Sequence, residues 1–120
     1  MTCLPRLQSS DVAEGLNYLH YCDVIHGDLK GVCDCSRFRF ATTLTPSQSN
    51  VLVDTTGRAR VTDFGFATVT RNLYLIRSAS NEHGGSTRWI APEILVDRGT
   101  YSKEADVFSF AMVMIEVRCR

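Results

Sequence analysis

The sequence predicts an α+β fold that is mainly helical and contains one small β-hairpin. The segment 9 to 20 has apolar residues at helical spacing, and the segment 103 to 116 is apolar almost throughout. Between them, two short β-branched runs flank the turn Thr55-Thr56-Gly57. The chain has 120 residues, 44% of them hydrophobic, which indicates one domain with a modest core.

The first helix is expected to begin at Ser9 or Ser10, because a serine side chain can cap the free amides at a helix start. Val12, Leu16 and Leu19 follow at i, i+4 and i+7. These three positions lie on one side of a helix. The segment therefore predicts a helix with a single apolar face.

Three short strands are expected in the middle of the chain. Val24-Ile25 is predicted to be a short buried strand, and the runs 50 to 54 and 58 to 62 are predicted to form a hairpin. The hairpin would place Asn50 and Asp63 at neighbouring ends.

The second half of the chain predicts a loop followed by a helix. Residues 63 to 93 are rich in Ser, Thr, Asn and Gly and are expected to be loop. The segment 103 to 116 is expected to be a helix buried on every side, because it has almost no polar face. Its apolar residues are Ala105, Val107, Phe108, Phe110, Ala111, Met112, Val113, Met114 and Ile115.

The charge of the chain is balanced, with 13 basic and 13 acidic residues. This balance argues against nucleic acid or an anionic membrane as a partner. No run approaches the roughly 18 apolar residues of a membrane span, and the first residues lack the pattern of a secretory signal. Five cysteines, without a C-x-x-C pair, favour reduced thiols and a cytoplasmic location.

Four polar motifs occur in a fixed order along the chain. They are His26-Gly27-Asp28-Leu29-Lys30, Asn50, Asp63-Phe64-Gly65 and Ala91-Pro92-Glu93. In this order they resemble the H-R-D-L-K-x-x-N, D-F-G and A-P-E motifs of eukaryotic protein kinases. One triplet alone would be a weak indication, but the ordered set is specific. The stretch 101 to 110 also resembles the kinase pattern D-V-W-S-F-G.

The resemblance implies a role for each polar residue of the motifs. Asp28 would accept or orient the proton of the substrate hydroxyl, and Lys30 would offset the charge of the γ-phosphate. Asn50 and Asp63 would hold Mg²⁺, a hard cation that prefers oxygen ligands, so ATP and Mg²⁺ are the expected cofactors. Leu52 matches the family position under the adenine ring, although a core leucine is an equally good interpretation.

Details of the motifs predict transfer to serine or threonine of a protein substrate. Lys30, two residues after Asp28, is typical of serine/threonine specificity. The run 85 to 93 resembles the substrate-docking segment of tyrosine-kinase-like serine/threonine kinases, in which Ser86 matches the threonine that links the catalytic Asp and Lys. Asp106 matches the residue that bonds the backbone of the catalytic loop. The predicted function is therefore that of an ATP-dependent protein serine/threonine kinase.

Gly27 departs from the family pattern. The usual residue is an arginine that pairs with a phosphate on the activation segment, so control by phosphorylation of that segment is in doubt. Small-molecule kinases of the aminoglycoside and choline type share a similar H-G-D…N…D core and form a rival interpretation. They lack an A-P-E segment, so Ala91-Pro92-Glu93 and the pattern at 101 to 110 favour a protein kinase.

The resemblance covers residues 10 to 117 and corresponds to the core of a kinase C-lobe, a partial protein kinase domain. Neither a G-x-G-x-x-G loop nor a V-A-I-K strand precedes it. The N-lobe is therefore expected to be absent, and the 120-residue chain to be inactive by itself. The alternative function is that of a catalytically inactive fragment acting as a binding or decoy module.

The catalytic-loop motif contains an insertion. Between Lys30 and Asn50 there are 19 residues, where the family pattern has two. Deleting residues 32 to 48, which have no helix or strand period, restores the family spacing. We interpret this stretch as a retained intron, since Val32-Cys33 can be encoded GTA-TGT, a splice donor, and Gln48 can be CAG, an acceptor. The alternative is a genuine surface insertion, because closing a longer loop costs only about 0.6 kcal/mol per doubling of its length.

Overall fold

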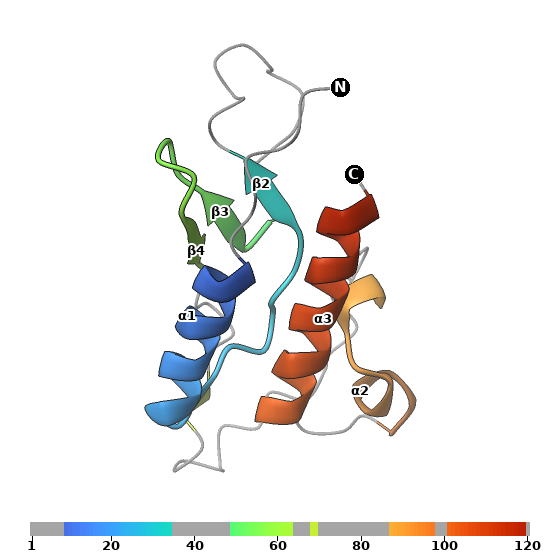
Figure 1. The fold of residues 1–120 in the computed structure, drawn as a ribbon. Coiled ribbons are helices and arrows are strands. Elements are labelled where there is room, and N and C mark those ends of the chain that lie inside the picture. Colours follow the sequence, from blue (N-terminus) through green and yellow to red (C-terminus); the bar gives the residue numbers. More distant parts are fainter. Residues whose placement is uncertain (1–8, 35–48, 64–67, 70–86, 98–100, 120) are drawn as a thin grey trace.

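The structure, a computed structural model, describes residues 9–34, 49–63, 68–69, 87–97 and 101–119. In chain order its elements are α1 (Ser9–Tyr21), β1 (Val24–Ile25), β2 (Val32–Asp34), β3 (Val51–Val53), β4 (Ala59–Val61), β5 (Thr68–Val69), the 3-10 turn η4 (Thr87–Trp89), α2 (Pro92–Asp97) and α3 (Lys103–Cys119). Helices α1 and α3 contact each other, and the segment from β1 to β2 runs between them (Figure 1). The predicted combination of helices with a small sheet is confirmed.

The main core lies between α1, the strands β3 and β4, and α3. Its buried members are Val12, Leu16, Leu29, Val51, Ala59 and Val113. The predicted apolar face of α1 supplies two of them, and its third member, Leu19, is only half-buried. A second, smaller cluster joins α2 to α3 and consists of Ala91, Ile94 and Ala105. The catalytic-loop motif therefore enters the core through Leu29, which fixes the polar residues on either side of it.

The predicted hairpin is confirmed, with each strand one residue shorter at both ends than expected. Strands β3 and β4 pair antiparallel, with Val51 opposite Val61. Asp54 closes the turn: its Oδ1 accepts hydrogen bonds from Thr56 Oγ1 at 2.5 Å, from Thr56 N at 2.9 Å and from Arg58 N at 3.1 Å. The bonds from Thr56 and Arg58 lower the pKa of Asp54 to about 2. The turn thus holds an ionised carboxylate.

Three parts of the expected loop 63 to 93 have regular structure, namely β5, η4 and the start of α2, so that prediction is wrong there. Strand β5 pairs antiparallel with β1 and supplies the hydrogen-bond partners that a buried strand needs. Helix α2 begins at Pro92, a residue whose fixed φ and missing N–H suit the first position of a helix. Residues 64–67 and 70–86 lie outside the described part of the chain. They include Phe64, Gly65 and Ser86, which belong to the predicted motifs.

The first three residues of the predicted insertion form a strand, contrary to the expectation that it has no strand pattern. Strand β2 pairs parallel with β3, with Cys33 opposite Leu52. Directly before β3, Asn50 N donates a hydrogen bond to Lys30 O at 2.8 Å. Strand β3 therefore has a hydrogen-bonded neighbour on both edges, β2 on one and β4 on the other.

Helix α3 is confirmed and extends to Cys119, but it is not buried on every side. It is capped by Ser102, whose Oγ accepts a hydrogen bond from Ala105 N at 3.1 Å. Val113 is fully buried, whereas Val107 and Ile115 are 53% and 54% exposed. Figure 1 shows α1 on one side of α3 and α2 on the other, and these described elements leave part of the helix surface uncovered.

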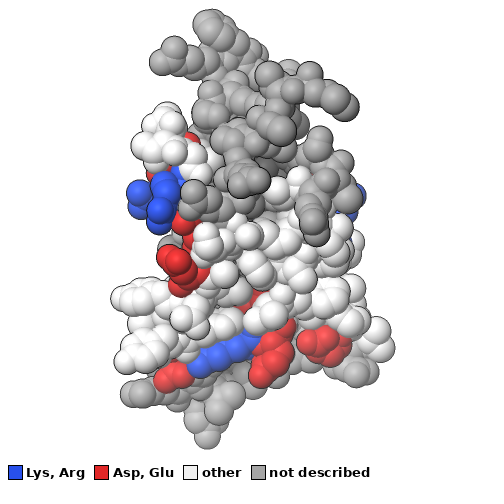
Figure 2. Space-filling view, in the orientation of Figure 1, with Lys and Arg blue, Asp and Glu red and all other residues white. Residues whose placement is uncertain are grey.

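Charged side chains of both signs lie next to one another on the face drawn in Figure 2, in keeping with the balanced composition. Over the described residues, that view contains no extended area of one sign. None of the helices in the described part of the chain has the length and apolar character needed to cross a bilayer.

Candidate active site

The loop from His26 to Lys30 is anchored to α3 by a buried carboxylate. Asp106, which is 2% exposed, accepts a hydrogen bond from His26 N on Oδ2 at 2.8 Å and one from Gly27 N on Oδ1 at 2.9 Å. The predicted bond between Asp106 and the loop backbone is thus confirmed. Gly27 has φ 76°, a left-handed conformation that glycine adopts without strain, so this residue lets both amides turn toward one carboxylate.

His26 ties the same loop to the end of strand β4. Its ring is completely buried; Nε2 lies 2.9 Å from Thr62 O, and Nδ1 lies 3.2 Å from Asp28 N. A carbonyl oxygen can only accept and an amide can only donate, so the ring carries its proton on Nε2 and accepts through Nδ1. The neutral imidazole therefore fixes the backbone of Asp28 relative to the residue that precedes Asp63.

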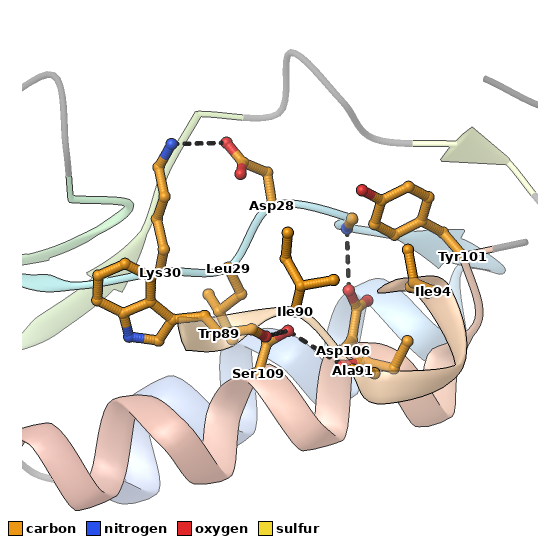
Figure 3. A pocket seen from close by; sticks show the side chains of 12 residues that line it. Asp28, Leu29, Lys30, Trp89, Ile90, Ala91, Ile94, Tyr101, Asp106 and Ser109 are labelled. Atoms are coloured by element: carbon orange, nitrogen blue, oxygen red, sulfur yellow. Dashed lines mark hydrogen bonds and ion pairs between the residues drawn. The ribbon is translucent and has the colours of Figure 1, made fainter. Parts of the chain in front are cut away.

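Three predicted site residues, Asp28, Lys30 and Asn50, are brought together. Lys30 Nζ lies 3.3 Å from Asp28 Oδ2 (Figure 3). Asn50 Nδ2 donates to Asp28 O at 2.5 Å and lies 3.0 Å from Asp28 Oδ2. Asn50 is 1% exposed, and the bonds of its amide nitrogen set the direction of the whole side chain. The carboxylate of Asp28 therefore has a cation and an amide donor on the same oxygen.

The hairpin brings Asp63 to the same end of the sheet as Asn50. Thr62 N donates to Asn50 O at 2.8 Å, and Asp63 is the next residue. Asp63 is exposed and has φ 61°, an uncommon conformation for a residue other than glycine. In the described part of the chain, Asn50 Oδ1 accepts no hydrogen bond. One amide oxygen and one carboxylate, both hard ligands, thus lie at one hairpin end, and this donor set suits Mg²⁺.

Leu52, the remaining predicted site residue, lies in the middle of β3 and is half-buried. It is two residues from Asn50 and has strand neighbours on both sides, Cys33 in β2 and Arg60 in β4. A half-buried leucine at this place leaves part of an apolar surface available for a flat ligand.

A small hollow borders Asp28 and Lys30. It is lined by Gly27, Asp28, Leu29, Lys30, Trp89, Ile90, Ala91, Ile94, Tyr101, Ala105, Asp106 and Ser109 (Figure 3). Ser109 Oγ holds one wall in place through a bond to Trp89 O at 2.6 Å. Burial raises the pKa of Tyr101, and the negative charge of Asp28 raises it further. Sequence reasoning missed Tyr101, because only the fold brings it near Asp28.

Comparison with known proteins identifies the family. A family model described as the protein kinase domain matches residues 47–120, more than half of the chain. The chain belongs to the protein kinase domain family. The predicted resemblance is therefore confirmed.

Individual kinases resemble this chain over most of its length. The "Probable serine/threonine-protein kinase drkC" of Dictyostelium discoideum is 38% identical over 97% of the chain. "Serine/threonine-protein kinase STY17" of Arabidopsis thaliana is 34% identical over 89%. "Mitogen-activated protein kinase kinase kinase mkh1" of Cytospora mali is 33% identical over 86%. The chain spans only 14%, 15% and 5% of the length of these three kinases, respectively.

Proposed function

We propose that the chain is the core of the C-lobe of a serine/threonine protein kinase, over residues 10 to 117. The protein that contains it would transfer the γ-phosphate of ATP to hydroxyl groups of protein substrates. The observation that carries this proposal is the cluster of Asp28, Lys30 and Asn50, with Asp63 at the same end of the hairpin. The names of drkC and STY17, both serine/threonine kinases, support the choice of acceptor.

Asp28 is proposed to handle the proton of the acceptor hydroxyl. The acceptor oxygen forms a bond to the γ-phosphorus, the bond from that phosphorus to the bridging β-phosphate oxygen breaks, and the hydroxyl proton passes to the Asp28 carboxylate. Hydrogen bonds from Asn50 Nδ2 to the main-chain and side-chain oxygens of Asp28 keep this carboxylate in one orientation. Positioning of this kind is the main contribution that the protein makes to phosphoryl transfer.

Lys30 is proposed to interact with two anionic groups, the Asp28 carboxylate and the γ-phosphate of ATP. Its ammonium lies 3.3 Å from Asp28 Oδ2 and is 17% exposed as a side chain. In the presence of nucleotide it would also face the γ-phosphate and offset its charge.

Asn50 and Asp63 are proposed to hold Mg²⁺ through Oδ1 and the carboxylate. When bound, this ion neutralises charge on the phosphates of ATP. The half-buried Leu52 is proposed to contact the adenine ring, because it offers apolar surface two residues from the metal ligand on the same strand.

A transfer assay tests this function directly. The longest natural product of the gene that contains this chain is incubated with Mg²⁺, a generic basic protein and ATP labelled in the γ-phosphate. We expect label on serine and threonine and its loss when Mg²⁺ is removed with a chelator. Label on tyrosine, or on an aminoglycoside or choline in place of protein, would contradict the proposal. Complete absence of transfer would favour the inactive binding module.

We also propose that residues 32 to 48 are a retained intron. The support is the spacing, because deletion of these 17 residues leaves Gly31 and Ser49 as the two residues between Lys30 and Asn50, as in the family pattern. Amplification of the mature transcript across this region should give a product in which the codon of Gly31 is joined to that of Ser49. A mature message that uniformly keeps the 17 extra codons between residues 31 and 49 would instead make the stretch, with β2, a genuine insertion.

A further inference from the structure

Arg88 provides an exposed positive charge beside the hollow that borders Asp28 and Lys30. Its guanidinium carbon Cζ lies 5.6 Å from the centre of the Trp89 ring, and Trp89 is one of the side chains that line the hollow (Figure 3). We propose that Arg88 is a specificity-determining residue, which binds an anionic side chain of the protein substrate close to the acceptor hydroxyl. This assignment rests on the proposed function, because it names the class of substrate for that site.

The backbone on both sides of Arg88 is fixed. Arg88 is the middle residue of the 3-10 turn η4, which is closed by a hydrogen bond of 3.3 Å from Ile90 N to Thr87 O. Trp89 O accepts a hydrogen bond from Ser109 Oγ at 2.6 Å, which ties the turn to α3. The fold therefore sets the position from which the Arg88 side chain extends.

The Trp89 ring also restrains the guanidinium of Arg88. A cation within about 6 Å of an aromatic ring centre is attracted to the ring, and tryptophan attracts it most strongly. Contact with the ring does not use up the five N–H donors of the guanidinium. An arginine held in this way loses less conformational entropy when it binds a ligand than an unrestrained arginine does.

The positive charge of Arg88 is not neutralised by a neighbouring carboxylate. In the part of the chain that the structure describes, no carboxylate lies within ion-pair distance of Arg88. The two carboxylates that line the hollow have other partners. Asp28 pairs with Lys30 at 3.3 Å, and Asp106 accepts hydrogen bonds from two loop amides. A ligand of Arg88 therefore meets no competing anion from either of them.

An anionic residue of the substrate fits this charge. Under the proposed function, the acceptor hydroxyl reaches Asp28, and the next residues of an extended substrate follow at about 3.3 Å per residue. The substrate residue that meets Arg88 is therefore within a few positions of the acceptor. A carboxylate or a phosphate there has the paired oxygens that a guanidinium binds with two parallel N–H bonds. The substrate class is thus a protein with an acidic or phosphorylated residue near the acceptor serine or threonine.

Peptide binding tests this proposal without the need for catalysis. The longest natural product of the gene that contains this chain is titrated, without ATP, with fluorescent peptides that carry one acceptor serine and one variable residue. The variable residue is glutamate, glutamine, arginine or phosphoserine, at each position within about three residues of the acceptor. At one position, glutamate should lower the Kd about two- to fivefold relative to glutamine, the effect of one exposed ion pair. The Kd for phosphoserine at that position shows which of the two anions binds more tightly.

Substitutions of Arg88 connect this preference to its charge. Arg88→Gln should bind the glutamate and glutamine peptides equally, and Arg88→Glu should reverse the preference toward the arginine peptide. The matched control is Arg60→Gln, which removes an arginine whose side chain is 73% exposed and pairs with Asp54. This control should keep the preference for glutamate. In the transfer assay, the same preference should appear in KM for the peptide, with KM for ATP unchanged.

Three results would overturn the proposal. They are equal Kd values for glutamate and glutamine at every position, no measurable binding of any peptide, and a glutamate preference that persists in Arg88→Gln. The last result would assign the preference to another cation. Absence of phosphoryl transfer together with an intact, Arg88-dependent preference would contradict the proposed function alone, because the binding measurement does not require transfer.

Discussion

Replacing Asp28 by asparagine is expected to lower kcat for phosphoryl transfer about 10²- to 10⁴-fold, the usual contribution of a positioned proton acceptor. Asparagine has nearly the same shape as aspartate but cannot take up the hydroxyl proton. The backbone oxygen of residue 28 would still accept the bond from Asn50 Nδ2. The loss should therefore appear in kcat, with KM for ATP little changed. Initial rates measured with labelled ATP on a generic protein provide the test.

A control and a fold measurement belong to this experiment. Glu14→Gln removes an exposed carboxylate of α1 and should leave the rate unchanged. The melting temperature of Asp28→Asn should stay close to that of the original protein. Asp28→Asn activity within a factor of two of the original protein, with label still on serine or threonine, would remove Asp28 from the proposed chemistry.

Replacing Asp106 by asparagine is expected to give the largest loss of stability, about 2–3 kcal/mol in the free energy of unfolding. The amide NH₂ of asparagine would face a backbone N–H of His26 or Gly27, so two donors would oppose each other in a buried site. His20, whose Nε2 lies 2.8 Å from Asp106 Oδ2, would also lose a charged acceptor. Chemical denaturation followed by circular dichroism measures the change in the free energy of unfolding.

The matched control for this substitution is Glu104→Gln. Glu104 lies in the same first turn of α3 but is exposed, so its effect should stay within about 0.5 kcal/mol. Equal stability of Asp106→Asn and the original protein would mean that the two loop amides do not depend on the charge of Asp106.

Local patterns in the sequence predicted α1, α3 and the hairpin well. Each of these elements has its own signal: a serine cap with spaced apolar residues, a nearly continuous apolar run, and two β-branched runs around a turn. Strands β2 and β5 were missed because each is only two or three residues long and depends on a distant partner. Helix α2 did have a local signal, the Pro92 that starts it, but the surrounding polar residues obscured it.

The site shows the same division between local and distant information. The motifs identified Asp28, Lys30 and Asn50, and the geometry brings them together. Which roles these residues and Asp63 and Leu52 perform stays a prediction. His20 was not singled out, because its partner Asp106 is 86 residues away in the sequence. A contact between residues so far apart in the sequence leaves no periodic pattern, so it can be seen only in the folded chain.

The hydrogen bond from Asn50 N to Lys30 O has a practical consequence for protein engineering. It joins the two residues that flank the 19-residue stretch at a separation of 2.8 Å. A segment whose ends meet across one hydrogen bond can change in length at little entropic cost, since that cost grows only slowly with loop length. This position is therefore suited to the insertion of a reporter domain with closely spaced termini, which would take the place of the stretch and its strand β2.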